Sequence, residues 1–532
     1  MFPVLQIYKF VWQDIFSFFR REFSPNGPVR KASLVAPEGQ RYTTTKTIGL
    51  INGFLSLFKF GLSDCNAGFG SNMRHFTYYC NDEGTYVNSY GKVMFNPENG
   101  NNARDVVDEM ATLLTAGRLN EDSRNIIANE IGNDSVNDAE LRIAQQLMIV
   151  TPEFHSTSLI DFTGEERQLP VPEPMDPDKP YKAVVFLMLE GGFDSYNLIV
   201  PLSQCSKDMY NEYARERGVA GLPQGFLLGI DTGQHSQVCS KFGVHASLPV
   251  LKNLYDASDL IFLANTGVLF EPVTKEDWDT KSLTQLFAHN VQQRETQQVD
   301  PYGDTAGAGV LGRMADALTR NSYSTGSFSI SGETFSLLSE GDAPSINQID
   351  PWIDPIFNPK PSRDGLDSVM FDLNNPSLST SGFYGKTWSD TFEANVKQTE
   401  ELKQALDNAN TGVEFPNNLI GNSLERVANV IKMSSTLKHN RQLFHVKDVL
   451  YDWHGVPDRY GDEILAPLNS AIDAFVQEMK AINMWDNVVL VMASDFGRTL
   501  TPNTAGGTDH GWGGTNNIFL LIIIVYYDDA IL

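Results

Sequence analysis

Carboxylate and imidazole side chains, which bind divalent cations readily, gather in a few short segments of this chain. In the segment LYDWHG, residues 450–455, Asp452 and His454 are two positions apart. Side chains at that spacing project to the same face of an extended segment, so both can reach one metal ion. A carboxylate and an imidazole on one face are suitable ligands for such an ion.

Two further segments carry polar residues directly after predicted strands, where ligands bind in open α/β sheets. The segment EGGFDSYN, residues 190–197, places Asp194 after one strand. The segment ASDFGRTLTPNTAGGTDHGWGG, residues 493–514, places Asp495 after another. The polar residues that follow in its glycine-rich loop are Arg498, Asp509 and His510.

Together these segments predict one shared metal or anion site at loop positions of one sheet. The expected metal ligands are Asp194, Asp452, His454, Asp495 and His510. For each residue alone an ordinary role stays open, because an Asp can close a turn or cap a helix and a His can pack in a core. Candidates for lining the pocket are His245, His289 and Asp509, although a helix cap or a packed imidazole explains either histidine equally well.

The elements that must position these residues follow an alternating pattern of strands and helices. Continuous apolar runs at 183–192, 260–264 and 487–493 predict buried parallel strands. Helix-period patterns occupy 248–255 and 464–482. Strands that alternate with helices predict a doubly wound α/β sheet with helices on both faces.

The chain is long enough for two domains, and a proline-rich linker suggests where they divide. Residues 171–182, VPEPMDPDKPYK, carry four prolines and no apolar periodicity. We expect a poorly defined region at 1–99, a small helical segment at 100–170, and an α/β domain at 183–532. Within that last domain, residues 340–390 are rich in Asp, Asn, Pro, Ser and Gly and predict a long excursion from the sheet.

Charge narrows the classes of partner, whereas neither terminus fixes the compartment. A formal net charge of -26 argues against nucleic acid or an anionic membrane and favours cations. An acidic surface is also typical of a salty or extracellular setting. The aromatic N-terminus does not read as a signal peptide. The apolar run 518–527 is too short to span a bilayer and predicts a buried strand or an aberrant end.

Four cysteines, Cys65, Cys80, Cys205 and Cys239, are too few for a disulfide scaffold and show no CxxC spacing. Either Cys65 with Cys80 or Cys205 with Cys239 could pair. The compartment therefore stays open on this observation as well.

The quoted segments, in their order and spacing, resemble the family called domain of unknown function 1501, from about residue 182 to residue 514. The matching words are LEGGFDSYNLIVP, FGVHASLPVLKNLYD, FAHN, GVLGRMAD, YDWHG and SDFGRTLTPNTAGGTDHGWGG. The resemblance implies an alkaline-phosphatase-like fold, shared with sulfatases and phosphomutases. Upstream, VDEMATLLTAGRL and AQQLMIVTPEFHST, within 100–157, resemble the C-terminal end of the domain of unknown function 1800 family. By this resemblance the α/β domain is truncated at its C-terminus.

The superfamily resemblance implies two sets of metal ligands. Asp452, His454 and His510 would form the first set, and Asp194 and Asp495 would contribute to the second. Two departures weaken the second set. Phe496 stands where phosphatases carry His, which favours a single metal, or calcium or magnesium. Ala288 stands where relatives often show Ser, and Ser195 is the nearest substitute for a nucleophile.

The leading hypothesis is therefore a metal-dependent hydrolase of a phosphate or sulfate ester. A divalent ion (zinc, calcium, magnesium or manganese) would activate Ser195 or water while Arg498 clamps the anion, with no organic cofactor. The alternative is a non-catalytic module outside the cytoplasm that binds a cation, a sulfated polysaccharide or a protein. A third hypothesis is an incompletely encoded copy without a stable fold. The extracytoplasmic setting is implied by the family resemblance alone.

Overall fold

The computed structural model describes residues 44–61, 95–156, 174–351, 363–375, 382–456, 461–511 and 520–525, with gaps of one to four residues inside these ranges. The chain forms two compact units. Unit 1 comprises residues 1–25, 35–169 and 356–403, and unit 2 comprises 26–34, 170–355 and 404–532.

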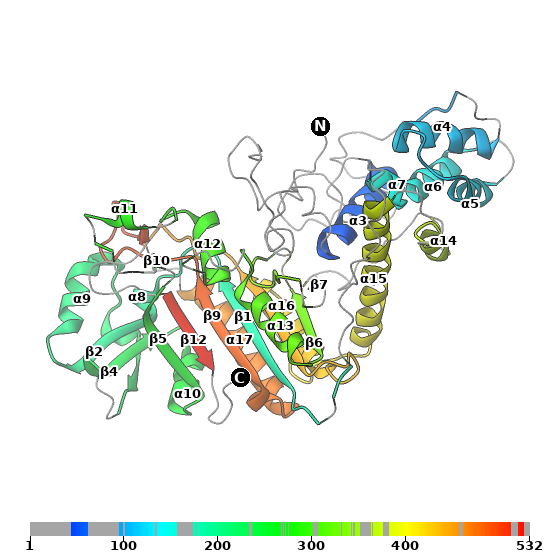
Figure 1. Ribbon diagram of the computed structural model, residues 1–532. Helices are drawn as coiled ribbons and strands as arrows, with labels where there is room; N and C mark the ends of the chain where they lie inside the picture. Colours follow the sequence, from blue (N-terminus) through cyan, green and yellow to red (C-terminus); the bar gives the residue numbers. More distant parts are fainter. Residues whose placement is uncertain are drawn as a thin grey trace. The chain divides into compact units, whose positions relative to one another are not determined.

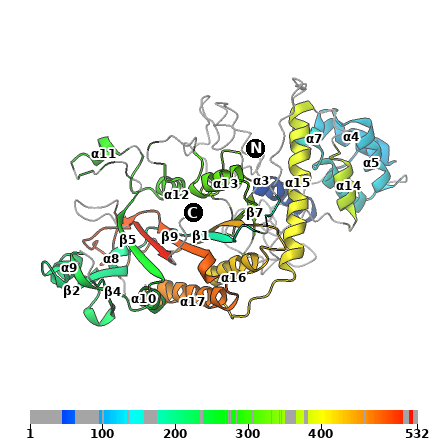
Figure 2. The same cartoon turned by 60° about the horizontal axis from the view of Figure 1, so that its bottom comes forward.

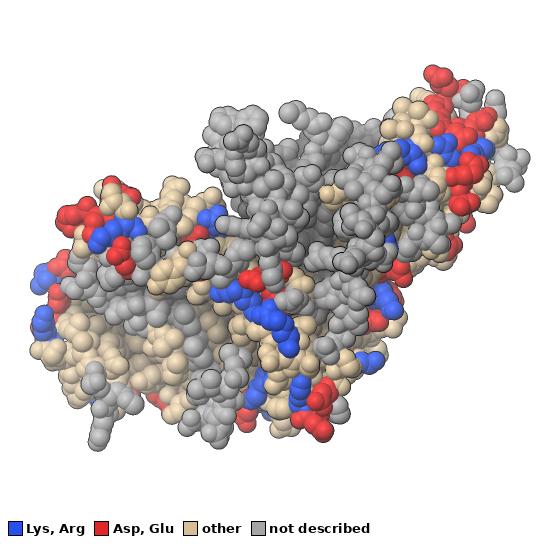
Figure 3. Space-filling view, viewed as in Figure 1, with Lys and Arg blue, Asp and Glu red and all other residues tan. Residues whose placement is uncertain are grey.

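Unit 1 is helical and builds its own apolar core. Asparagines cap successive helices: the side chains of Asn102, Asn120 and Asn137 each accept a backbone N–H in the first turn. On the face seen in Figure 3, the described surface of this unit carries acidic and basic groups side by side. The described helices are α3 (Thr44–Phe60), α4 (Ala103–Thr115), α5 (Glu121–Ile131), α6 (Asp138–Met148), α7 (Pro152–His155), α14 (Leu366–Asp372) and most of α15 (Gly382–Leu406).

Residues 356–403 belong to this helical unit, which corrects the expectation that the whole of 183–532 forms one α/β domain. The physical reason is apolar burial. Trp388 and Phe392 on α15 enter the same core as Val106 and Leu147, and each is at most 1% exposed. Trp388 also donates its indole N–H to the carbonyl of Val150 over 3.1 Å. The excursion expected at 340–390 therefore leads from the sheet into the other unit.

Unit 2 is built on a seven-stranded sheet with the order β5-β12-β9-β1-β8-β6-β7. Five neighbouring strands, β9 to β7, run parallel, and β12 pairs antiparallel with both β9 and β5 (Figure 1). The bounds are β1 (Lys182–Leu189), β5 (Leu260–Thr266), β6 (Thr325–Ser329), β7 (Ile346–Gln348), β8 (Arg441–Asp448), β9 (Val488–Ser494) and β12 (Leu520–Val525).

Helices cover both faces of this sheet, which confirms the predicted α/β fold class. Figure 2 shows α10, α16 and α17 on one face and α12 and α13 on the other. The strands expected at 183–192, 260–264 and 487–493 correspond to β1, β5 and β9. The helices of this unit are α8 (Ser195–Leu198), α9 (Met209–Arg217), α10 (Pro249–Asp256), α11 (Trp278–Lys281), α12 (His289–Gln298), α13 (Val310–Arg320), α16 (Leu419–Lys432) and α17 (Ala466–Ala481). In the described part of the chain no helix is long and apolar enough to cross a membrane.

A small antiparallel sheet of order β2-β4-β3 accompanies the main one, and a disulfide joins two of its strands. Cys205 ends β2 (Ile199–Cys205) and pairs with Cys239, which begins β4 (Cys239–His245). The third strand is β3 (Leu227–Asp231). Of the two pairings that the sequence left open, Cys205 with Cys239 therefore forms; Cys65 and Cys80 lie outside the described residues.

We expect the disulfide to stabilise unit 2 substantially. It closes a loop of 34 residues in the unfolded chain, for which loop-closure entropy gives about 3–4 kcal/mol. Changing Cys205 and Cys239 together to Ala should lower the urea midpoint accordingly. The matched control is Ser203→Ala, at an exposed position of the same strand β2, which should leave the midpoint unchanged. An unchanged midpoint in the first double variant would contradict the expectation.

We expect acid to destabilise unit 2 between pH 6.5 and about 4. Burial lowers the pKa of His445 to about 3 and those of His245 and His439 to about 4. In this window the unfolded chain therefore binds protons that the folded state excludes, and stability falls as the pH falls. Burial raises the pKa of Asp448 to about 6, so in this window the folded state binds a proton there that the unfolded chain does not. This bound proton offsets the proton that the folded state excludes from one histidine.

For these four groups the net difference is about two protons, or roughly 2.7 kcal/mol per pH unit at most. Urea unfolding at a series of pH values measures this slope. In His439→Gln the slope should decrease by about one proton. A stability that is independent of pH between 6.5 and 4.5 would refute the expectation.

Candidate metal centre

Three adjacent strands of the main sheet end at the same level, and the candidate site follows their carboxyl ends. Strand β1 lies between β8 and β9, and its last residue, Leu189, is opposite both Asp448 and Ser494. The segments that follow lead to Asp194 from β1, Asp452 from β8 and Asp495 from β9. Parallel strands therefore deliver residues that are far apart in sequence to one edge of the sheet.

Two glycines let these three segments approach closely. A Cβ atom on Gly191 would collide with the backbone of Asp452, and one on Gly192 would collide with the ring of Phe496. Both residues also have positive φ, at 128° and 84°, which L side chains rarely adopt. The glycine pair is thus required for the β1 segment to pack against the segments after β8 and β9.

A buried guanidinium ties the same segments together. Arg498 is 2% exposed and donates from Nε to the carbonyl of Gly192 at 2.6 Å, and from Nη2 to the carbonyl of Gly191 at 2.6 Å. Nη2 also contacts the carbonyl of Tyr451 at 2.9 Å and Oδ1 of Asp452 at 2.7 Å. Arg498 therefore fixes the position of the Asp452 carboxylate.

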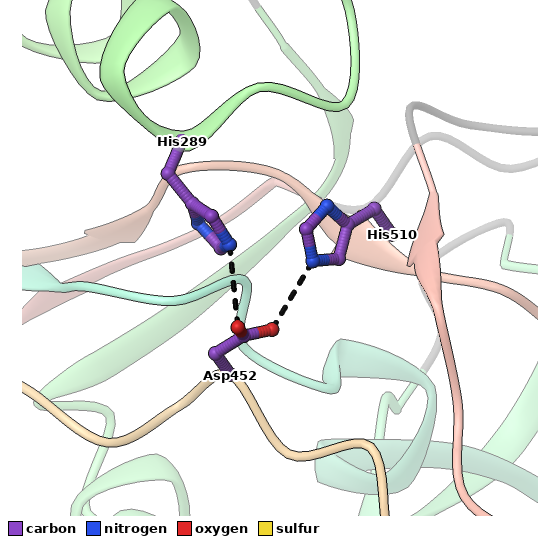
Figure 4. Close-up of side chains that lie close together, drawn as sticks. All are labelled: His289, Asp452 and His510. Atoms are coloured by element: carbon purple, nitrogen blue, oxygen red, sulfur yellow. Dashed lines mark hydrogen bonds and ion pairs between the residues drawn. The ribbon is translucent and has the colours of Figure 1, made fainter.

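Three histidines surround that carboxylate. Nε2 of His510 lies 3.1 Å and Nε2 of His454 lies 2.8 Å from Oδ1 of Asp452, while Nε2 of His289 lies 3.4 Å from Oδ2. Figure 4 shows His289 and His510 pointing at Asp452. One ligand atom from each of His289, Asp452 and His510 lies within 4.8 Å of the others, close enough to hold one metal ion.

The partners of the opposite ring nitrogens decide what these histidines present to Asp452. Nδ1 of His510 faces the carbonyl of Phe287 at 2.8 Å, and Nδ1 of His289 faces Oδ2 of Asp495 at 2.8 Å. Both partners accept hydrogen bonds, so each Nδ1 carries the proton. A neutral ring then turns a lone pair on Nε2 toward the carboxylate oxygens of Asp452. Because the Nε2 lone pair and the carboxylate lone pairs repel each other, the arrangement requires either a cation between them or a second proton on the imidazole.

The backbone beside the cluster is strained at two bulky residues. Phe287, whose carbonyl holds His510, has φ 66°, and Leu450, two residues before Asp452, has φ 84°. Positive φ costs roughly 1–3 kcal/mol at such residues, and strain of this kind concentrates at functional sites. The surrounding contacts, including those of Arg498, hold this arrangement in place.

Electrostatics keep the central carboxylate charged. Burial opposes the charge of Asp452, but the hydrogen bond and charge of Arg498, with the charges of His289 and His454, outweigh it and hold the pKa of Asp452 at about 2. The hydrogen bond that His289 donates to the Asp495 carboxylate raises the pKa of His289 above its usual value. A metal must therefore displace a proton that His289 holds more tightly than usual, so metal binding should strengthen as the pH rises.

The structure brings together part of the predicted site. Asp452, His454 and His510 meet directly, and Asp495 joins them through His289. Asp509 accepts a hydrogen bond from Nδ1 of His454 at 2.9 Å.

Other predicted residues lie elsewhere. The carboxylate of Asp194 pairs with the guanidinium of Arg217, whose side chain is 0% exposed. Ser195, the expected nucleophile, is 1% exposed in α8. His245 is buried, and its Nδ1 accepts the N–H of Ser247 at 3.1 Å.

His289 is the residue whose role the sequence underestimated. It was a candidate for the pocket wall, and the structure puts it in the cluster as the first residue of α12. In the sequence, the only indication of a role for His289 was the segment FAHN, residues 287–290. Phe496 packs against both imidazoles, with its ring centroid 4.9 Å from that of His289 and 4.6 Å from that of His510. Phe496 therefore supports the positions of both imidazoles.

Part of this site lies in a segment that matches a known protein family. Residues 382–519 match the family described as protein of unknown function DUF1501. The matched segment includes Asp452, His454, Asp495, Arg498 and His510. The resemblance upstream of residue 382 stays a prediction, and the resemblance of residues 100–157 to the domain of unknown function 1800 family finds no support. No curated protein matches the chain.

Two solved structures are similar at a low level. One is the C-terminal periplasmic domain of EcEptC from Escherichia coli in complex with Zn, at 11% identity and a TM-score of 0.28, covering 68% of this chain and 78% of that one. The other is the same domain, described without Zn, at 12% identity and a TM-score of 0.27, covering 68% and 77%. At these TM-scores the similarity carries no argument about the site.

We expect Asp495 to influence metal affinity through His289, whose Nδ1 lies 2.8 Å from the Asp495 carboxylate. Asp495→Asn should weaken zinc binding roughly 10- to 100-fold, because an amide holds the Nδ1 proton of His289 less firmly than a carboxylate does. Asp452→Ala and His510→Ala should abolish binding. Isothermal titration with zinc measures each affinity.

Asp316→Asn is the matched control. This buried aspartate on α13 accepts the backbone N–H groups of Glu340 and Ala343 and lies outside the cluster. Its zinc affinity should equal that of the wild type. Equal affinity in Asp495→Asn would show that the pair of Asp495 with His289 does not orient a ligand.

Proposed function

We propose that this chain binds one divalent metal ion through His289, Asp452 and His510 and hydrolyses a phosphate or sulfate ester there. The observation that carries the proposal is the convergence of three ligand atoms within 4.8 Å, with both histidines turned so that Nε2 faces Asp452. Two imidazoles and one carboxylate favour zinc or manganese over calcium and magnesium, which prefer oxygen ligands.

The residues around the ion have separate tasks in this proposal. Arg498 holds Asp452 in position, while Asp495 and the carbonyl of Phe287 orient the two imidazoles. A bound divalent ion supplies positive charge for the ester oxygens and for the charge that develops on them. That charge matters because the chain carries a net charge of -26, which repels anionic substrates.

His454 is suited to proton transfer at this site. Asp509 holds its Nδ1, so Nε2 is left to take up or release a proton beside Asp452. Its side chain is 44% exposed, which leaves room for a substrate. With Ser195 buried, water is the favoured nucleophile.

One observation favours the non-catalytic alternative. Nε and Nη2 of Arg498 are occupied by main-chain carbonyls and by Asp452, so neither is free to clamp a substrate anion. With Ser195 also buried, the site retains ligands for a cation but offers no covalent nucleophile. In this alternative the chain binds a cation, a sulfated polysaccharide or a protein without turnover.

We also propose an oxidising compartment outside the cytoplasm. The disulfide of Cys205 with Cys239 supports it, because such bonds form and persist in oxidising surroundings and are rare in the cytosol.

Ester hydrolysis tests the main proposal. Zinc- or manganese-loaded protein should hydrolyse p-nitrophenyl phosphate or p-nitrophenyl sulfate, and Asp452→Asn should reduce the rate roughly 100-fold or more. His454→Gln should reduce the rate by a similar factor while zinc remains bound, since it removes a proton donor. Asp473→Asn, on the exposed face of α17, is the control and should leave the rate unchanged.

The outcomes separate the alternatives. Bound metal with hydrolysis that depends on Asp452 supports the hydrolase. Bound metal without hydrolysis of either ester favours the binding module. A folded protein that takes up no zinc or manganese refutes both the metal site and the hydrolase.

A further inference from the structure

The side-chain amide of Asn503, in the glycine-rich loop of the candidate site, uses both of its polar atoms. Its Oδ1 accepts the backbone N–H groups of Ala505 at 2.9 Å and of Gly507 at 3.0 Å. Its Nδ2 donates to the carbonyl of His454 at 3.1 Å and to Oδ1 of Asp509 at 3.0 Å. Because the oxygen meets donors and the nitrogen meets acceptors, these partners fix the orientation of the amide.

This amide joins two segments that are far apart in sequence. Its oxygen closes the turn of residues 503–507, which the bond from the backbone N–H of Asn503 to the carbonyl of Gly507 also closes. Its nitrogen reaches the segment after β8 that carries His454. Gly507 permits this approach, since a Cβ there would lie 2.2 Å from the carbonyl oxygens of His454 and Gly455. Asn503 therefore ties the loop to the backbone of His454.

Asp509 is the residue through which the amide acts on the site. The backbone of Asp509 is held by Thr499, whose N–H donates to the Asp509 carbonyl at 2.9 Å and whose Oγ1 accepts the Asp509 N–H at 3.0 Å. The side chain of Asp509 is 57% exposed, and its Oδ1 accepts from Nδ2 of Asn503 and from Nδ1 of His454. An exposed side chain loses its rotamer freedom only where contacts hold it. The bond from Asn503 therefore favours the carboxylate orientation that meets His454.

We propose that Asn503 is a positioning residue, which holds the Asp509 carboxylate and through it the ring of His454 in the orientation for proton transfer. The part in proton transfer rests on the proposed hydrolase, whereas the placement of the ring does not. An asparagine suits this position because it donates and accepts without charge. A carboxylate at position 503 would instead face that of Asp509 and repel it.

Asn503→Ser separates the two halves of the amide's contacts. A serine hydroxyl can accept the N–H groups of the turn, as asparagine does, but it lacks the nitrogen that donates to Asp509 and His454. In the zinc-loaded protein, kcat for p-nitrophenyl phosphate or p-nitrophenyl sulfate should therefore fall about tenfold. KM and zinc affinity should stay within about twofold of the wild type, because the metal ligands are held by other groups. Steady-state kinetics and isothermal titration measure these values.

A second substitution tests whether Asn503 acts through His454. In the His454→Gln background, Asn503→Ser should lower kcat by less than about twofold, since residues that act as a unit have non-additive effects. An equal loss of kcat in both backgrounds would show that Asn503 only stabilises the loop, and would overturn the proposal.

Crystal structures of the metal-free wild type and the metal-free Asn503→Ser variant give a readout that needs no turnover. Nδ1 of His454 should lie within hydrogen-bonding distance of Asp509 in the wild type and leave that contact in the variant. The turn of residues 503–507 should keep its shape in both. A His454 ring that stays in contact with Asp509 in the variant would overturn the proposal.

Asn418→Ser is the matched control. Asn418 caps α16, where its side chain accepts the backbone N–H of Gly421 at 2.8 Å, and serine is also a favourable cap. This variant should keep the wild-type kcat and zinc affinity. Should Asn503→Ser fail to fold, Asn503→Asp keeps the length of the side chain and the acceptor of the turn, and should lower kcat at least as much.

The two proposals fail in different ways. A His454 ring released by Asn503→Ser, in a protein that hydrolyses neither ester, supports the positioning role and refutes the hydrolase. Hydrolysis that depends on His454 and proceeds at the wild-type kcat in Asn503→Ser supports the hydrolase and refutes the positioning role.

Discussion

The buried guanidinium of Arg498 is the interaction on which the arrangement of the site depends. It follows β9, bonds two carbonyls of the segment after β1, and bonds a carbonyl and a carboxylate of the segment after β8. A charge at 2% exposure is costly unless it is paired and hydrogen-bonded. Those same bonds lock the three strand ends together, so the cost of burying Arg498 is offset by contacts that position Asp452.

Placing Asp452 in this way creates an electrostatic conflict that a cation resolves. The carboxylate stays ionised, its neighbours are histidine Nε2 atoms, and behind His289 lies Asp495 with a side chain at 0% exposure. The carboxylates of Asp495 and Asp452, together with the Nε2 lone pairs that face Asp452, make positive charge in the middle of the cluster strongly favourable. Protons supply it in acid, and a bound divalent ion would supply it at higher pH. The strain at Phe287 and Leu450 is consistent with a site arranged for binding rather than for stability.

Local sequence determined the elements and the nearest ligand pairs. The apolar runs at 183–192, 260–264 and 487–493 specified buried strands, because few other structures tolerate such segments, and the spacing of Asp452 and His454 put both side chains at one place. Strand β8 was missed because buried Gln442, His445 and Asp448 interrupt its apolar pattern.

Only the tertiary structure decided which carboxylates and imidazoles meet. Asp194 sits where its motif predicted, yet Arg217, from a helix with no recognisable motif, takes its carboxylate. His289 enters the cluster because α12 begins beside β9, a fact that no local pattern encodes. The helical unit likewise gained residues 356–403 through burial of Trp388. Spacing along a chain fixes the direction of neighbouring side chains, whereas distant partners are chosen by packing, which depends on the whole fold.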